Sequence, residues 1–98
     1  MPEIVKSSMF GTWLAGLRDR RGRAIVLARI DRLASGNRGD WEPVGSGIFE
    51  MRIHYGPGYR IYVLERGRTI AILLCGGDKS SQKRDIATAK SIASQWKD

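Results

Sequence analysis

The amino-acid sequence predicts an α+β fold, with a small, mostly antiparallel sheet, a helical hairpin packed on one of its faces and a C-terminal helix. Three observations carry this prediction. Residues 49–55 and 59–64 alternate between two sets of side chains and are separated by the glycine-rich turn 56–58. The run 69–75 is apolar, which is typical of a strand covered on both faces. Stretches with apolar side chains at helical spacing lie before and after these strands.

The first half of the chain is expected to form a short strand and then the two helices of the hairpin. Residues 3–7 form the strand, and Ser8 caps the first helix by accepting a main-chain N–H. The apolar stripe of this helix has the spacing i, i+3, i+4 and i+7 and consists of Phe10, Trp13, Leu14 and Leu17. The second helix runs from about residue 23 to residue 35, with a stripe of Val26, Ile30 and Leu33. Gly36 suits the left-handed conformation that ends such a helix.

The second half is expected to contain a loop, three strands and the last helix, which completes the order β-α-α-β-β-β-α. Residues 37–47 are polar, rich in glycine and contain a proline, so this stretch is predicted to be a loop. The turn 65–68 joins the last two strands, and its glycine supplies a positive φ. The last helix begins at Ser80 or Ser81 and reaches about residue 97, with a stripe of Ile86, Ala89, Ala93 and Trp96.

Length, charge and cysteine content limit the class of protein. The 98 residues make one domain, 1–98, and the single Cys75 cannot form an internal disulfide and suits a buried strand. One unpaired cysteine and no signal-peptide pattern favour a cytoplasmic protein, and no apolar run approaches the roughly 20 residues of a membrane span. The chain has 17 Lys and Arg against 10 Asp and Glu, a net charge of +7, which favours RNA, DNA or an acidic protein as a partner. The alternative is a basic surface with no specific target.

The alternation in the strands groups three basic side chains that could hold a phosphate. If Met51 and Ile53 face the core, Arg52, His54 and Arg60 share the opposite face of two neighbouring strands. Guanidinium groups present paired N–H donors that match phosphate oxygens, and an imidazole can transfer protons near neutral pH. The alternative is an ordinary solvated strand face.

A second candidate group surrounds the start of the last helix. The segment 76–81, Gly-Gly-Asp-Lys-Ser-Ser, can expose main-chain N–H groups to an anion, or it can be a flexible turn with a cap. Lys79, Lys83 and Arg84 oppose the helix dipole, which suits an external anion, although exposure to solvent also screens such charges. One His and one Cys allow no Ser-His-Asp or Cys-His arrangement and no zinc site. Any catalysis would therefore depend on basic side chains. Such side chains are suited to the cleavage of RNA, in which the 2′-OH of the substrate is the nucleophile.

Two long stretches resemble a known family of toxins. The run FEMRIHYGPGYRIYVLERGRTIAILLCGGDKSSQKRDIATAK resembles the addiction-module killer proteins, which are HigB-like toxins of the RelE/ParE superfamily in type II toxin–antitoxin systems. Its most specific parts are Tyr-Gly-Pro-Gly-Tyr-Arg and Leu-Cys-Gly-Gly-Asp-Lys-Ser. The run EIVKSSMFGTWLAGLRDRRGRAIVLARIDRLASGNRGD is similar to the first strand and helix hairpin of that family. The resemblance covers nearly the whole chain and implies a RelE/ParE-like fold and a cognate antitoxin, often a helix-turn-helix DNA-binding protein.

The resemblance also implies an activity. RelE-like members cut mRNA in the ribosomal A site with Arg, Lys, Tyr or His residues. Arg52, Arg60 and Lys79 lie where such groups are expected, and His54 is a candidate acid or base. The candidate RNA contacts are Tyr62, Lys83 and Arg84. The first hypothesis is therefore a ribosome-dependent endoribonuclease that acts on mRNA without a metal or a small-molecule cofactor.

Two alternatives to the nuclease remain open at the level of sequence. ParE-like relatives share the fold and act on DNA gyrase, so a gyrase inhibitor without nuclease activity is the first alternative. No tyrosine follows residue 79, where some RelE-like nucleases carry one near the C-terminus. The second alternative is a basic binding module whose main partner is its antitoxin. The nuclease needs the basic residues of the shared sheet face, and the two binding proteins do not.

Overall fold

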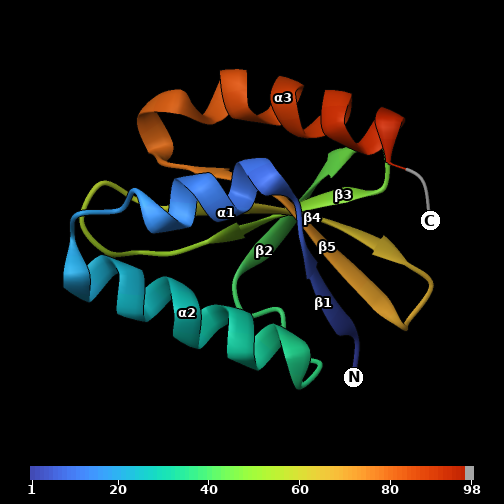
Figure 1. The fold of residues 1–98 in the computed structure, drawn as a ribbon, viewed down its shortest axis with the longest axis horizontal. Coiled ribbons are helices and arrows are strands. Elements are labelled where there is room, and N and C mark those ends of the chain that lie inside the picture. Colours follow the sequence, from blue (N-terminus) through green and yellow to red (C-terminus); the bar gives the residue numbers. More distant parts are fainter. Residues whose placement is uncertain (97–98) are drawn as a thin grey trace.

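A five-stranded mixed sheet in the order β1-β5-β4-β3-β2 forms the centre of the protein (Figure 1). The computed structural model describes residues 1–96. In chain order the elements are β1 (Glu3–Lys6), α1 (Ser8–Ala15), α2 (Arg20–Ala34), β2 (Trp41–Gly45), β3 (Ile48–Arg52), β4 (Arg60–Arg66), β5 (Ile70–Gly77), a 3₁₀ turn η1 (Lys79–Ser81) and α3 (Gln82–Gln95). Strand β1 pairs parallel to β5, and the other neighbours pair antiparallel. The α+β prediction is confirmed.

Helices cover both faces of the sheet (Figure 1). On one face, the apolar stripes of α1 and α2 pack against the side chains of Met51 and Ile53, which are 0% and 2% exposed. The predicted register of β3 is therefore confirmed, because a shift by one residue would have exposed both side chains. On the other face, α3 packs against β4 and β5 through its predicted stripe, with Ala89 at the centre. The apolar run of β5 is buried between these two helical layers, as predicted.

A bulge explains why two consecutive residues of β5 face the same helical layer. Tyr62 pairs with Cys75, whereas the next residue of β4, Val63, pairs with Leu73. One residue of β5 is therefore extra, and Leu74 and Cys75 both belong to the cluster beneath α3. Cys75 is buried, as predicted, and burial raises the pKa of its thiol to about 12.

The prediction of a loop over residues 37–47 is wrong in part, because β2 lies within it. Trp41 pairs with Met51, and the ladder continues past Pro43 to an irregularity before Gly45. The element order is therefore β-α-α-β-β-β-β-α. Proline is tolerated here because β2 is the edge strand of the sheet, where one row of main-chain groups has no neighbouring strand.

The residues that cap the helices differ from the predicted ones. Ser7, not Ser8, caps α1, and its Oγ accepts from the N–H of Phe10 at 3.0 Å. Asp19 caps α2, which therefore begins at residue 20 instead of about 23. Ser81 is the N-cap of α3 but makes no side-chain cap bond there. Helix α3 ends at residue 95, and the predicted end at Lys97 lies outside the described residues. Within residues 1–96, no helix has both the length and the apolar character needed to cross a bilayer.

Candidate functional site

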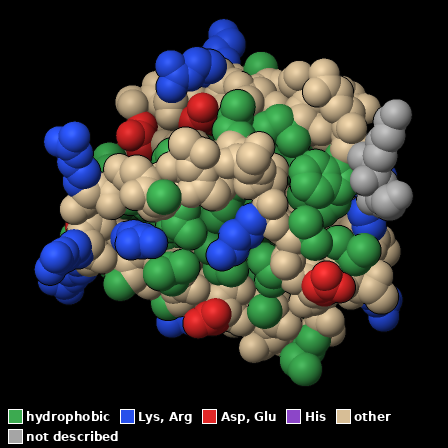
Figure 2. All heavy atoms as spheres, viewed as in Figure 1, with side chains coloured by type: hydrophobic (Ala, Val, Ile, Leu, Met, Phe, Trp, Pro, Cys, Tyr) green, Lys and Arg blue, Asp and Glu red, His purple; other side chains and the backbone are tan. Residues whose placement is uncertain are grey.

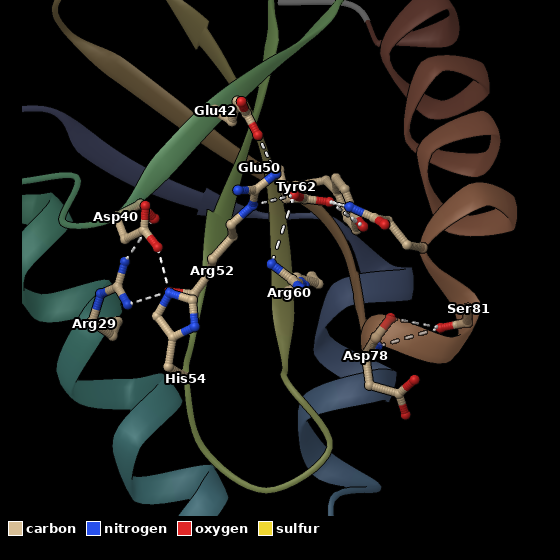
Figure 3. A network of polar contacts seen from close by, with 11 residues as sticks. Arg29, Asp40, Glu42, Glu50, Arg52, His54, Arg60, Tyr62, Asp78 and Ser81 are labelled. Atoms are coloured by element: carbon tan, nitrogen blue, oxygen red, sulfur yellow. Dashed lines mark hydrogen bonds and ion pairs between the residues drawn. The ribbon is translucent and has the colours of Figure 1, made fainter.

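Arg52 and Arg60 are direct partners in the antiparallel ladder of β3 and β4. Residues opposite each other in such a ladder place their side chains on the same face of the sheet. Figure 3 shows the two guanidinium groups on the same side of this strand pair, with His54 beyond the end of β3. The structure therefore brings together the three basic residues that the alternation grouped, on the face opposite to the α1–α2 hairpin.

A fully buried carboxylate, Glu50, lies between these two arginines. Its Oε1 accepts from Arg52 Nε at 2.9 Å and lies 3.9 Å from Arg60 Nη1. Its Oε2 accepts from the hydroxyl of Tyr62 and from the amide of Gln82, both at 2.9 Å. Burial alone would raise the pKa of Glu50, but the hydrogen bonds from Gln82, Arg52 and Tyr62 and the charge of Arg60 together lower it. Glu50 is thus ionised at neutral pH and connects β3, β4 and the start of α3.

The two arginines differ in how far the protein already satisfies them. Arg52 binds Glu50 and also pairs with Glu42 on β2, and about a third of its side chain is exposed. Arg60 is only 8% exposed, so its side chain lies almost entirely out of solvent. Its Nε has no hydrogen-bond partner, and the Glu50 carboxylate at 3.9 Å is too distant for a good hydrogen bond. The carboxylates of Glu50 and Glu42 therefore bind Arg52 more closely than Glu50 binds Arg60.

His54 forms an acid–base pair with Asp40, which was not among the predicted site residues. Its Nε2 lies 2.5 Å from Oδ2 of Asp40, and about three quarters of the imidazole is exposed. The hydrogen bond with His54 is the largest cause that lowers the pKa of Asp40, although partial desolvation opposes it. The Asp40 carboxylate can hold the imidazole in one orientation. A His–carboxylate pair at a solvent-exposed position can transfer protons to and from a bound substrate.

Lys79 lies at the same end of the strand pair as His54. Its main-chain N–H donates to the carbonyl of Pro57 in the β3–β4 turn at 3.4 Å. A surface hollow of about 510 Å³ follows along the start of α3 and is lined by Ser80, Ser81, Lys83 and Arg84. Lys79 and Lys83 are exposed. The predicted second group therefore adjoins the first, with its cations turned to solvent.

The start of α2 adds further cations to this end of the molecule. Asp19 Oδ2 accepts from the hydroxyl of Tyr59 at 3.2 Å, and Oδ1 lies 3.4 Å from that of Tyr55, so α2 begins beside the β3–β4 turn. We call the exposed cations from the starts of α2 and α3 the basic end: Arg20, Arg21, Arg23, Lys79, Lys83 and Arg84. Figure 2 shows Lys and Arg side chains standing out along the left and upper margins of one face, where Figure 1 shows these segments. Such a cluster attracts a polyanion.

The two glycines before η1 have a packing role. A Cβ atom on Gly76 would lie 2.3 Å from the ring of Trp13, and one on Gly77 would lie 1.8 Å from Oδ2 of Asp85. Both glycines belong to β5, so they form neither a flexible turn nor an open loop. They let α1 and α3 approach the end of β5 closely.

Replacing Gly77 with alanine is expected to lower the free energy of unfolding by about 1–3 kcal/mol, because the new methyl group displaces the Asp85 carboxylate from its bond with Ser81. Gly11→Ala is the control, since Gly11 lies in α1 with no atom within 4 Å of an added Cβ. That change is expected to be neutral or to stabilise by up to about 1 kcal/mol. Urea unfolding of both variants makes the comparison, and equal stabilities would contradict the packing role.

Two kinds of residue were assigned wrongly or missed in the sequence. Tyr62 was a candidate RNA contact, but it is 0% exposed beneath α3, and burial is the main cause that raises the pKa of its hydroxyl. Glu50, Gln82 and Asp40 were missed. Glu50 alone had a signal, because it alternates in phase with Arg52. Within residues 1–96, no three His, Cys, Asp or Glu side chains are grouped so that they could hold a metal ion.

Comparisons with known proteins show the family of the chain. Residues 12–97 match the family model described as Phage derived protein Gp49-like (DUF891). A Haemophilus influenzae protein, described only as an uncharacterized protein, is 46% identical over 93 residues, which cover 95% of this chain and 94% of that protein. No solved structure matches the chain significantly. The chain therefore belongs to the Gp49-like family of phage-derived proteins, which is related to the RelE/HigB toxins.

Proposed function

We propose that this protein is the toxin of a type II toxin–antitoxin system and that it cleaves mRNA on the ribosome. The relationship of its family to the RelE/HigB toxins supports the first part. The basic end supports the second, because exposed lysines and arginines bind the phosphates of RNA irrespective of sequence. The His54–Asp40 pair adds a group that can move protons beside these cations.

Arg60 is the observation that carries the nuclease proposal. A guanidinium that is nine-tenths buried normally has its donors satisfied by the protein, yet Nε of Arg60 has no partner. Because Nε itself is buried, a phosphate oxygen would bind the Nη groups of Arg60, in a site of low dielectric where each bond is stronger than in water. The interaction of Arg60 with the substrate would thus be strongest in the transition state, where negative charge develops on the oxygens of the pentacoordinate phosphorus.

The reaction needs only groups that RNA and this face of the protein supply. His54 acts as the base and takes the proton from the 2′-OH of the ribose, and Asp40 stabilises the imidazolium that forms. The 2′-oxygen bonds to phosphorus, and the bond from phosphorus to the 5′-oxygen breaks. Lys79 protonates the departing 5′-oxygen. The products are a 2′,3′-cyclic phosphate and a 5′-hydroxyl, and Arg60 holds the phosphoryl oxygens throughout.

One observation favours the alternative of a binding protein without catalysis. The charges of Arg52 and Arg60 are compensated by Glu50 and Glu42, two positive against two negative. A protein that inhibits gyrase or binds only its antitoxin needs no free guanidinium, and this network would then serve to stabilise the sheet. The exposed cations of the basic end are compatible with either function.

An assay with three arms tests the proposed function. Purified protein is incubated with mRNA alone, with mRNA on ribosomes, and with gyrase and relaxed plasmid. The expected result is cleavage of the ribosome-bound mRNA with products that carry 2′,3′-cyclic phosphates, and no loss of supercoiling. Inhibition of gyrase without cleavage would favour the first alternative. A protein inactive in all three arms that still binds its antitoxin would favour the second.

We further propose that the partner is a cognate antitoxin, of the helix-turn-helix type, with acidic residues that face the basic end. Its association rate is expected to fall as ionic strength rises, because screening over about 8–10 Å at physiological salt removes long-range attraction. Stopped-flow binding between low and physiological salt measures this. A rate that does not change with salt would contradict electrostatic steering and favour an apolar interface.

A further inference from the structure

Arg29 is a buried cation of α2 that the proposed reaction does not use. Arg29 is 9% exposed, and its guanidinium donates to three main-chain carbonyls. Nη1 donates to the carbonyl of Arg52 at 2.6 Å, and Nη2 donates to those of Arg38 and Asp40 at 3.1 Å and 3.2 Å. One side chain therefore ties α2 to the loop before β2 and to the end of β3, as Figure 3 shows for Asp40 and Arg52.

The loop is shaped to admit this guanidinium. Gly39 has a φ of +66°, and a Cβ atom there would lie 2.6 Å from Nη2 of Arg29. A side chain at position 39 would thus push the guanidinium away from the carbonyls on both sides of it. The main-chain N–H of Arg52 also donates to the carbonyl of Asp40 at 2.9 Å, so the loop and the strand end are held to each other as well as to Arg29.

The two segments that Arg29 joins carry the two members of the acid–base pair. Asp40 stands on the loop, and His54 follows two residues after Arg52, whose carbonyl Arg29 binds. The charged groups that act on the Asp40 carboxylate are His54, Arg52 and Arg29, and together they lower its pKa against partial desolvation. A displacement of the loop relative to the strand would separate Oδ2 of Asp40 from Nε2 of His54, which lie 2.5 Å apart.

We propose that Arg29 is a positioning residue, which holds the Asp40 loop and the end of β3 so that Asp40 stays paired with His54. This inference rests on the proposed function for its catalytic meaning, but the geometry it describes can be measured without RNA. Lysine at this position keeps the charge but cannot donate to three carbonyls from one planar fork. A purely structural Arg29 would affect stability and leave the pair of side chains as it is.

Arg29→Lys tests the proposal, with Arg32→Lys as the matched control. Arg32 lies on the same helix and is exposed. The titration of the Asp40 carboxyl is followed by NMR in both variants and in the wild type. We expect Arg29→Lys to raise the pKa of Asp40 toward its ordinary value, because the hydrogen bond with His54 is lost, and Arg32→Lys to leave it unchanged. An Asp40 titration in folded Arg29→Lys identical to that of the wild type would overturn the proposal.

A double-mutant cycle on RNA cleavage gives the second readout. Misplacement of a catalytic group by about 1 Å can cost roughly 10²-fold in rate, so Arg29→Lys is expected to lower cleavage by about 10- to 100-fold. In a His54→Gln background the same change should cause no further loss, because Arg29 acts through the pair. Independent, multiplying losses would contradict a positioning role.

A second variant and a readout without RNA keep the positioning role of Arg29 testable. If Arg29→Lys does not fold, Gly39→Ala displaces the guanidinium from the loop side without removing it, and the same rise in the pKa of Asp40 is expected. If the wild type cleaves no RNA, the proposed function fails, whereas the Asp40 titrations still decide whether Arg29 positions the pair.

Discussion

Replacing Arg60 with alanine is expected to lower cleavage of ribosome-bound mRNA by about 10²–10³-fold, the usual loss when one pre-organised donor to a transition state is removed. The reason is that Arg60 is nearly buried, has no hydrogen-bond partner at Nε and lies 3.9 Å from the Glu50 carboxylate. Arg60→Lys should recover little activity, because a single ammonium group cannot replace the planar fork. Arg52→Ala should cause a smaller loss, since Glu50 and Glu42 already occupy that guanidinium. Single-turnover cleavage rates of the four proteins measure these differences.

The control for Arg60 is Arg68→Ala, which removes an exposed cation from the β4–β5 turn. Its cleavage rate should stay within about twofold of the wild type, as surface changes away from a site usually have little effect. Because Arg60 is nearly buried, folding of each variant is checked by urea unfolding before rates are compared. Wild-type cleavage by folded Arg60→Ala would show that this sheet face is not the active site.

Replacing Glu50 with alanine is expected to lower the free energy of unfolding by about 3–5 kcal/mol, the range for breaking a buried ion pair from one side. The change leaves the hydroxyl of Tyr62 and the amide of Gln82 without their acceptor, and Arg60 without a nearby carboxylate. Glu42→Ala is the control, because that carboxylate is half exposed and should contribute no more than about 1 kcal/mol. Equal losses of unfolding free energy in the two variants would contradict the central role of Glu50.

The same carboxylate should make stability depend on acid pH. The folded protein lowers the pKa of Glu50 below its ordinary value of 4.5. A lowered pKa stabilises the fold above the unfolded value, and this contribution is lost as pH falls through the folded value. The difference in stability between the wild type and Glu50→Gln should therefore shrink below pH 4.5. A difference that stays constant from pH 7 to pH 3 would mean that folding does not shift the pKa of Glu50, and it would contradict the lowered value.

Patterns of period two and period 3.6 were sufficient to predict that Met51 and Ile53 face the α1–α2 hairpin and which face of each helix is apolar, but not that Glu50 is buried. Met51 and Arg52 point to opposite faces because adjacent residues of a strand must do so, whatever the rest of the chain does. The stripes of α1, α2 and α3 were predicted for the same reason. Strand β2 was missed because its pairing depends on an edge position, which only the folded sheet creates, and its proline argued against a strand.

For the candidate site, the sequence could predict only which side chains share a face of the sheet. Alternation grouped Arg52, His54 and Arg60, but it could not show that α3 covers Tyr62 or that Arg60 is nearly buried. The contact between Asp40 and His54 joins residues 14 positions apart through a loop whose conformation Arg29 holds. Such contacts depend on tertiary packing and leave no periodic signal. The packing role of Gly76 likewise depends on Trp13, which lies far away in the sequence.

Mapping of transcript 5′ ends after brief induction tests the central claim most directly, with folded Arg60→Ala induced in parallel. Cells that express the wild type are expected to show new 5′ ends within translated reading frames, and cells that express Arg60→Ala are expected to show none above background. Growth arrest by the wild type without new 5′ ends, or equal cutting by both proteins, would contradict it.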